Sequence, residues 1–211
     1  MGTCVDMDLF LVRHGITDWN QQKRYLGHTD RSIINSELDQ LEKLQKELTA
    51  QRFDHAFTSD LRRCQETLAY LNIPAPISVD ARLRELNFGD WEGKTYNELK
   101  DEKTYQDWLD NWEHGSIPNG ESSDAFKNRL DSFLQDLFKQ SMETTPHGKK
   151  QFLLMTHGGV IRYLVSRFVP SMSFWDLSVS HGQGIRLTLL RQKEEWVCNS
   201  LLAVPSQEKG K

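Results

Sequence analysis

The chain has 211 residues, of which 37% are hydrophobic and 27% are charged, and its formal net charge at pH 7 is −4. This composition is typical of a globular protein and excludes a disordered or fibrous chain. No basic stripe stands out, so we expect no nucleic acid as a partner. The few, widely spaced cysteines, Cys4, Cys64 and Cys198, favour a reducing cytoplasm over a disulfide framework. No apolar run approaches the length of a membrane span, so we expect no membrane partner.

Short apolar runs alternate with amphipathic stretches along the chain. We expect strands at 9–12, 55–58, 77–79, 152–155 and 185–189, the last with a hairpin partner at 196–198. Helices are expected at 38–48, 126–137 and 158–168, where apolar residues recur on one helix face. The polar stretch 141–150 is expected to be a surface loop, and 1–6 and 204–211 are expected to be loose tails.

Strands that alternate with helices predict an α/β fold. We expect three α/β/α layers around a mostly parallel central sheet, in a single domain over residues 1–211. The stretch at about 86–122 is expected to form a small helical, cap-like insertion.

Polar clusters directly follow the runs expected to be strands. Arg13-His14-Gly15 follows the first run, 59–63 follows the second, and 156–159 follows the run at 152–155. Because ligands of open α/β sheets bind beyond the carboxyl ends of the strands, we expect histidines and arginines to meet in one crevice. Arginine matches the geometry of phosphate oxygens, and free N–H groups at a helix start favour an anion. These clusters therefore predict a phosphate site.

The same clusters carry a family resemblance. Residues 11–20 resemble the opening signature of the histidine phosphatase superfamily, also called the phosphoglycerate-mutase-like family. Residues 59–67, 83–93 and 156–159 resemble its later blocks, in the same order. The resemblance implies phosphoryl transfer without a metal or another cofactor.

The resemblance also implies a role for each residue of the catalytic set. His14 would attack phosphorus and become a phosphohistidine, and Glu85 would pass a proton to the leaving oxygen. Arg13, Arg63 and His157 would hold the phosphoryl oxygens.

Further phosphate contacts are implied for Thr17, Asn20, Gly27 and Gly158. Glu92 and Glu121 are rivals to Glu85, whereas Arg62 is expected to be a surface neighbour of Arg63. The remaining histidines are expected to be ordinary surface or loop residues: His28, which lies near the expected pocket mouth, His55, His114, His147 and His181. No H-x-x-x-H or C-x-x-C pair predicts a zinc site.

The segment 86–122 bears on the reaction. It holds nine acidic residues against three lysines, a balance expected to repel a second phosphate and to disfavour a mutase. Its aromatic residues are expected to form core or to line the substrate mouth: Trp91, Tyr96, Tyr105, Trp108 and Trp112. Residues 118–122 also resemble a P-G-G-E-S element of the family's phosphatase branch.

We therefore expect a phosphomonoesterase whose partner is a small-molecule phosphate ester, with α-ribazole-5′-phosphate as the leading substrate. A homodimer is left open. The alternatives within the family are a cofactor-dependent phosphoglycerate mutase, a sugar-phosphate or fructose-bisphosphatase-like enzyme, and a phosphoserine phosphatase. Outside it, the alternatives are a non-catalytic phospho-ligand binder and a metallohydrolase, which loss of activity with a chelator would reveal.

Overall fold

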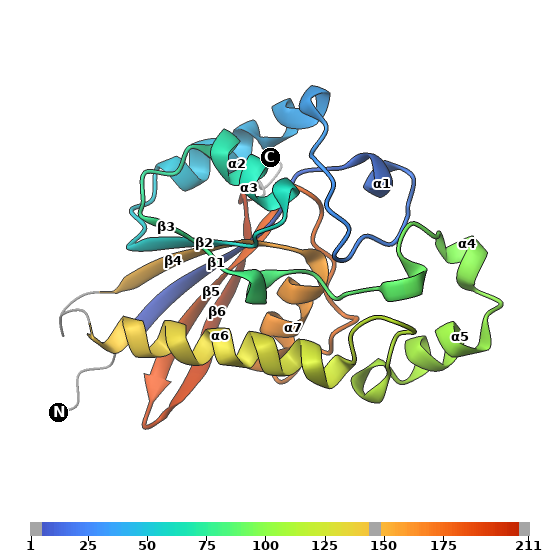
Figure 1. The fold of residues 1–211 in the computed structure, drawn as a ribbon. Helices are drawn as coiled ribbons and strands as arrows, with labels where there is room; N and C mark the ends of the chain where they lie inside the picture. The colour runs from blue at the N-terminus through green and yellow to red at the C-terminus, as the bar shows by residue number, and fades with distance from the viewer. Residues whose placement is uncertain (1–5, 144–148, 207–211) are drawn as a thin grey trace, which may run out of the picture.

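The computed structural model describes residues 6–143 and 149–206, which contain a six-stranded sheet in the order β3-β2-β4-β1-β5-β6 (Figure 1). Every stretch expected to be a strand lies within one. The strands are β1 (Asp6–Arg13), β2 (His55–Thr58), β3 (Ile77–Val79), β4 (Lys150–Thr156), β5 (Gly184–Gln192) and β6 (Glu195–Val204).

The centre of the sheet is parallel, as expected. Strand β4 pairs in parallel with both β1 and β2, and β2 pairs in parallel with β3. Only β5 and β6 run antiparallel to their neighbours. Because Arg13 at the end of β1 pairs with Thr156 at the end of β4, the next residues, His14 and His157, leave the sheet side by side.

Alternation along β1 divides the core between the two faces of the sheet. Leu9 and Leu11 pack with one apolar cluster, and Phe10 and Val12 pack with the other. The first face is covered by α6 (Ser123–Glu143) and α7 (Gly158–Phe168), and the second by α2 (Glu42–Thr49) and α3 (Arg62–Leu71) (Figure 1). The predicted three-layer α/β/α architecture is confirmed.

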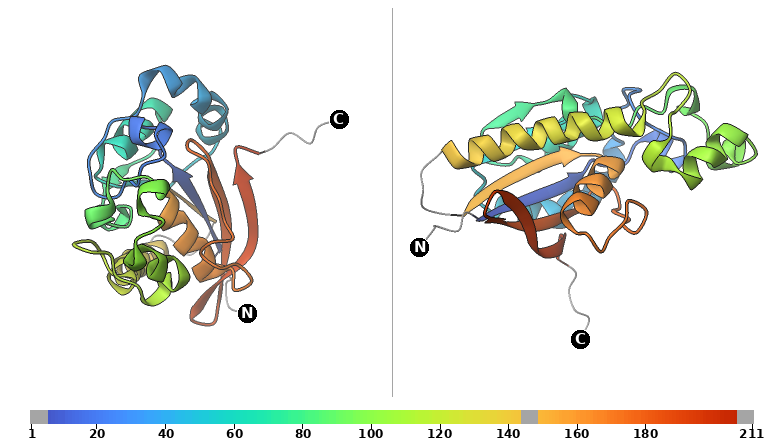
Figure 2. Two further views of the ribbon diagram at one scale, coloured as in Figure 1. Left: turned by 90° about the vertical axis from the view of Figure 1, so that its right-hand side faces the viewer. Right: turned by 90° about the horizontal axis from the view of Figure 1, so that it is seen from below.

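The remaining helices are short. The segment 86–122 contains η3 (Gly89–Trp91), α4 (Tyr96–Leu99), α5 (Lys103–Asp110) and η4 (Trp112–His114), and it lies beyond one end of the sheet (Figure 2). Outside this segment lie α1 (Asp18–Gln21), η1 (Asn35–Leu41) and η2 (Ala81–Leu83).

Two boundary predictions were wrong. Helix α6 continues through Glu143 and β4 starts at Lys150, so both ends of the predicted loop 141–150 belong to regular structure. Buried Ser141 still donates from Oγ to the Phe138 carbonyl within this last turn, at 2.7 Å. Asp6 and Val204 were assigned to tails, but they pair with β5. The rest of both predicted tails, apart from Pro205 and Ser206, lies outside the described residues.

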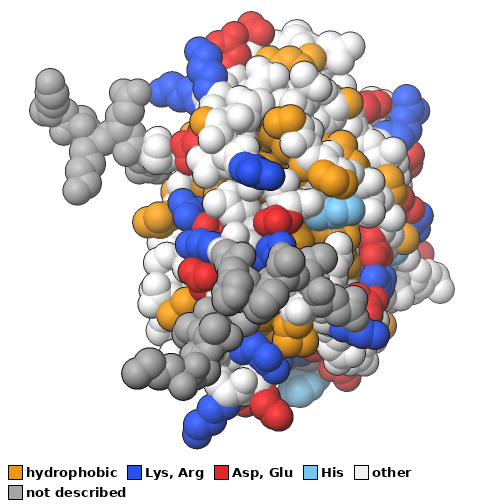
Figure 3. Space-filling view, turned by 90° about the vertical axis from the view of Figure 1, so that its left-hand side faces the viewer, with side chains coloured by type: hydrophobic (Ala, Val, Ile, Leu, Met, Phe, Trp, Pro, Cys, Tyr) orange, Lys and Arg blue, Asp and Glu red, His pale blue; other side chains and the backbone are white. Residues whose placement is uncertain are grey.

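The distribution of surface charge and the character of the helices relate to the partners expected from the sequence. On the end of the molecule opposite α4 and α5, acidic and basic side chains are interspersed (Figure 3). None of the described helices combines the length and the apolar character needed to span a membrane.

Candidate active site

A cavity of about 220 Å³ opens at the carboxyl ends of β1 and β4. Five of the predicted catalytic and phosphate-binding residues line it, namely Arg13, His14, Asn20, Glu85 and Gly158. The first strand, the loop after it, the loop after η2 and the start of α7 thus converge on one cavity, as the sequence clusters predict.

The ring of His14 is buried, with 3% of the residue exposed. Its Nδ1 lies 2.6 Å from the carbonyl oxygen of Gly15. Because a carbonyl oxygen only accepts, Nδ1 carries the proton and Nε2 keeps its lone pair. Burial, together with the positive charge of Arg63, holds the pKa of His14 well below its usual 6.5. The geometry and electrostatics therefore present a neutral imidazole suited to act as a nucleophile.

Arg13 offers donors to the cavity beside His14. Its Nη1 donates to the carbonyl of Val179 at 2.7 Å, whereas its buried Nε has no hydrogen-bond partner among the described residues. A buried donor without a partner is the kind of group that a ligand oxygen satisfies. Burial lowers the pKa of Arg13 to about 10, so its guanidinium remains charged at neutral pH. A Cβ at position 158 would lie 3.3 Å from the Arg13 Cζ, so Gly158 lets the guanidinium lie against the start of α7.

Arg63 and His157 lie next to the cavity without lining it. The ring centroids of His157 and His14 are 5.1 Å apart. Arg63 donates from Nε to His157 Nδ1 at 3.3 Å, from Nη1 to the Thr29 carbonyl at 3.0 Å and from Nη2 to the Gly27 carbonyl at 2.6 Å. The structure thus brings these groups together around His14, while a direct phosphate contact from Arg63 or His157 stays a prediction.

The other predicted phosphate contacts differ in their position relative to the cavity. Asn20 lines the cavity, and its Oδ1 accepts from the Thr17 backbone N–H at 3.1 Å and from the Thr17 hydroxyl at 2.9 Å. Thr17 is fully buried and caps α1. A Cβ on Gly27 would lie 2.3 Å from the Leu86 carbonyl oxygen, so this close backbone approach requires glycine. Phosphate contacts from Thr17 and Gly27 stay predictions.

Glu85 is the acid that faces the cavity. Its Oε1 accepts from the Leu86 N–H and its Oε2 from the Gly159 N–H, both at 2.9 Å. The rivals are engaged elsewhere, because Glu92 accepts from the backbone N–H groups of 28 and 29 and Glu121 pairs with an arginine of α6. The arrangement therefore favours Glu85 over both.

The charge of the cavity wall differs from the charge of the segment 86–122. Among the described residues, Glu85 is the one acidic residue that lines the cavity, whereas the cations Arg24 and Arg162 also line it. The acidic side chains of 86–122 turn to solvent or to local partners, as Glu98 does at the N-terminus of α4. The acidic balance of the segment is therefore not displayed on the described cavity wall, and its repulsion of a second phosphate stays a prediction.

Aromatic side chains also contribute to the cavity wall. Of the aromatic residues weighed from the sequence, Trp108 lines the cavity, Tyr96 is exposed, and the other three are buried in the core. Phe174 and Trp175, which the sequence did not reveal, complete the wall, and the Arg162 Cζ lies 5.5 Å from the Trp175 ring centroid. Arg162 had one available signal, because it lies four positions after Gly158 and therefore on the same helix face.

His181 was expected to be an ordinary loop residue, and its environment contradicts this. Its ring centroid lies 5.3 Å from that of His14, and its buried Nε2 has no hydrogen-bond partner among the described residues. The next N–H, of Gly182, points to the carbonyls of Arg13 and His14, each at 3.2 Å. Burial, with Arg13 and Arg63 nearby, lowers the pKa of His181 to about 3. His181 thus belongs to the immediate surroundings of the predicted nucleophile.

The other histidines differ in outcome. His114 is exposed, as expected, and His55 is half-buried in β2. His28 is half-buried, and its Nε2 donates to the Glu85 carbonyl at 3.0 Å. His147 lies outside the described residues. Arg62 is exposed and pairs with Glu66, as expected of a surface residue.

Known proteins resemble this chain along most of its length. An adenosylcobalamin/alpha-ribazole phosphatase of Escherichia coli is 30% identical over 182 residues, which cover 83% of this chain and 87% of the relative. A phosphoglycerate mutase-like protein of Arabidopsis thaliana is 30% identical over 171 residues, 78% of this chain and 72% of the relative. The crystal structure of the alpha-ribazole phosphatase from Shigella flexneri matches with a TM-score of 0.76 at 27% identity, covering 92% of this chain and 96% of that one.

The family model for the histidine phosphatase superfamily (branch 1) matches residues 9–201. This span contains all four sequence blocks and the whole cavity wall. The chain therefore belongs to the histidine phosphatase superfamily.

Proposed function

We propose that this protein hydrolyses a small organic phosphate monoester through a phosphohistidine on His14. The observation that carries this proposal is the hydrogen bond from His14 Nδ1 to the Gly15 carbonyl. It leaves the Nε2 lone pair for phosphorus, in a cavity that is also lined by Arg13, whose buried Nε has no hydrogen-bond partner among the described residues.

The reaction has two displacements. His14 Nε2 attacks phosphorus while the P–O bond to the leaving group breaks, and Glu85 gives that oxygen its proton. Water then attacks the phosphohistidine, the P–N bond breaks, and Glu85 takes the proton back from the water. Arg13 stabilises the charge on the phosphoryl oxygens, and Arg63 and His157 are proposed to join it.

The leading substrate is α-ribazole-5′-phosphate, whose aromatic base would contact Trp108, Phe174 and Trp175 in the cavity wall. The relatives named for alpha-ribazole phosphatase activity support this choice. We place the activity in the cytoplasm, a proposal supported by the free thiols of Cys64 and Cys198.

A second candidate is a phosphoglycerate mutase, because Arg24 and Arg162 would tolerate a second anionic group on the substrate. A mutase would be stimulated by 2,3-bisphosphoglycerate and would convert 3-phosphoglycerate without net release of phosphate. A phosphatase would release inorganic phosphate with no such requirement. A panel of α-ribazole-5′-phosphate, p-nitrophenyl phosphate, phosphoserine and 3-phosphoglycerate, compared by kcat/KM, separates these functions.

The nucleophile is tested by His14→Ala, with His114→Ala as the matched control because His114 is exposed and does not line the cavity. Brief incubation with a ³²P-labelled substrate should give acid-labile label on the wild type and on the control. The His14→Ala variant should show neither label nor turnover. Acid-labile label on folded His14→Ala protein would refute the assignment.

A further inference from the structure

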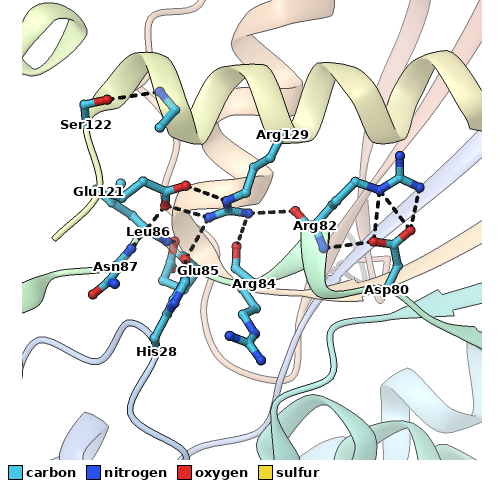
Figure 4. A network of polar contacts seen from close by, with 11 residues as sticks. His28, Asp80, Arg82, Arg84, Glu85, Leu86, Asn87, Glu121, Ser122 and Arg129 are labelled. Carbon is cyan, nitrogen blue, oxygen red and sulfur yellow. Dashed lines mark hydrogen bonds and ion pairs between the residues drawn. The ribbon is translucent and has the colours of Figure 1, made fainter.

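One guanidinium on α6 holds the backbone that presents Glu85 (Figure 4). Arg129 donates from Nη1 to the carbonyls of Arg82 and Arg84, at 2.6 and 2.7 Å, and from Nη2 to the carbonyl of Glu85 at 2.9 Å. A single side chain thus contacts three carbonyls within four consecutive residues.

Arg129 is itself fixed. Its Nε and Nη2 donate to the two carboxylate oxygens of Glu121, at 2.7 and 2.9 Å, and its Cζ lies 4.8 Å from the ring centroid of Phe126. The side chains of Arg129 and Glu121 are only 18% and 12% exposed. A two-pronged arginine–carboxylate pair fixes direction as well as distance, so the fork of Arg129 has a defined orientation towards the loop.

The remaining contacts of Glu85 come from elsewhere. Its carbonyl also accepts from His28 Nε2 at 3.0 Å, and its carboxylate accepts from the N–H groups of Leu86 and Gly159. Helix α6 therefore holds the main chain of Glu85, while the start of α7 holds its carboxylate. If the contacts from Arg129 are lost, the carboxylate keeps its local partners, but the Glu85 carbonyl is then held by His28 and no longer by α6.

We propose that Arg129 is a positioning residue that sets the place of the Glu85 carboxylate in the cavity, with Glu121 as the group that orients it. This inference rests on the proposed role of Glu85 as proton donor. Arg129 does not line the cavity, so it acts on the reaction through Glu85 and not through the substrate.

The proposal makes a kinetic distinction between substrates. A proton donor matters for an alkyl phosphate, whose leaving alkoxide is a strong base, and matters little for p-nitrophenyl phosphate, whose leaving group needs no proton. Arg129→Gln should therefore lower kcat/KM for alkyl phosphates, which reports the first displacement, by roughly 10- to 100-fold. This is less than the about 100- to 10,000-fold contribution of a well-placed acid, because Glu85 is displaced but still present. For p-nitrophenyl phosphate, kcat/KM should stay within about 3-fold of the wild type, because its leaving group needs no proton.

The experiment compares Arg129→Gln, Arg129→Lys and Glu121→Gln with the control Arg82→Gln. The Arg82 side chain is part of the same network and binds the side chains of Asp80 and, on α6, Asp136. Its variant keeps the carbonyl that Arg129 contacts. Arg129→Lys keeps the charge but cannot make all the contacts of the fork, so it should show a smaller form of the same substrate-dependent loss. Arg82→Gln should affect both substrates equally and slightly. Circular dichroism and thermal unfolding check that each variant is folded.

Glu85→Gln is measured in parallel and separates the proposed role of Glu85 from the proposed role of Arg129. If Glu85→Gln loses activity equally on both substrate classes, the proposed role of Glu85 fails. If Glu85→Gln is selective but Arg129→Gln and Glu121→Gln are not, the positioning role of Arg129 fails alone. If Arg129→Gln does not fold, Arg129→Lys and Glu121→Gln decide, and unselective losses in both overturn the proposal.

Discussion

Replacing His181 by glutamine should make the protein relatively more stable in mild acid. The imidazole of His181 is held neutral in the folded state, where burial lowers its pKa to about 3, while in the unfolded chain it returns to about 6.5. Between these values the unfolded state binds a proton that the folded state does not. The wild type therefore loses stability as pH falls below about 6.5, and a variant without His181 loses less.

The magnitude follows from the two pKa values. At pH 7.5 the histidine costs the folded state almost nothing, whereas at pH 5.0 the unbound proton costs about 2 kcal/mol. The free energy of unfolding of His181→Gln, relative to wild type, should therefore rise by about 2 kcal/mol between pH 7.5 and pH 5.0. Part of the acid sensitivity should persist in the variant, because burial also holds the pKa values of His14 and His157 well below the usual range.

Urea unfolding followed by tryptophan fluorescence at several pH values measures this difference. The exposed His114, replaced by glutamine, is the matched control and should run parallel to the wild type. A gap between His181→Gln and wild type that stays constant from pH 7.5 to pH 5.0 would show that His181 is not a buried neutral group, and would refute the environment described for it.

Gly159→Ala tests packing around the site, and Trp91→Ala, with Tyr96→Ala as its control, tests packing in the core. In Gly159→Ala the new Cβ would lie 2.3 Å from Glu85 Oε1, so the carboxylate must move. In steady-state assays kcat for alkyl phosphates should fall at least about tenfold, and an unchanged kcat would contradict this placement of the acid. Trp91 is 1% exposed, and Trp91→Ala should lower the free energy of unfolding by about 3–5 kcal/mol. Tyr96→Ala, at a site that is 55% exposed, should change it by less than about 0.5 kcal/mol, and equal effects of the two would contradict the assignment of core.

The parts of the fold that follow from local pattern could be predicted from the sequence. The run at 9–12 alternates between two buried faces, and residues 13–15 follow it at once, so both the strand and the polar cluster at its end are visible. The helix over 158–168 matches α7 in full because a glycine pair opens it and its apolar residues recur at helical spacing. The meeting of His14 and His157 then follows from parallel pairing alone.

Other parts depend on packing between distant segments, which no local period encodes. His181 and Trp175 belong to an irregular stretch between α7 and β5, and their approach to the cavity is set by contacts such as the one from Arg13 to the Val179 carbonyl. The extent of α6 was also missed, because the polar residues after Phe138 carry no apolar stripe to mark a helix. At these positions the sequence gives the residue types, but the direction of each side chain is set by tertiary contacts.

The charge of the cavity wall also depends on which side chains face the cavity, and not on the composition of a segment. A segment with nine acidic residues is negative as a whole. A substrate in the cavity meets only the side chains that face inward, and in this segment those are apolar ones such as Phe88 and Trp108. The inward cations come from elsewhere, Arg24 from the loop after α1 and Arg162 from α7. Arg24 also pairs with Glu98 of the segment, with 3.7 Å between Nη1 and Oε2, so part of its charge is already compensated. The described lining of the cavity therefore carries more cations than anions, Arg13, Arg24 and Arg162 against Glu85, although the segment as a whole is negative.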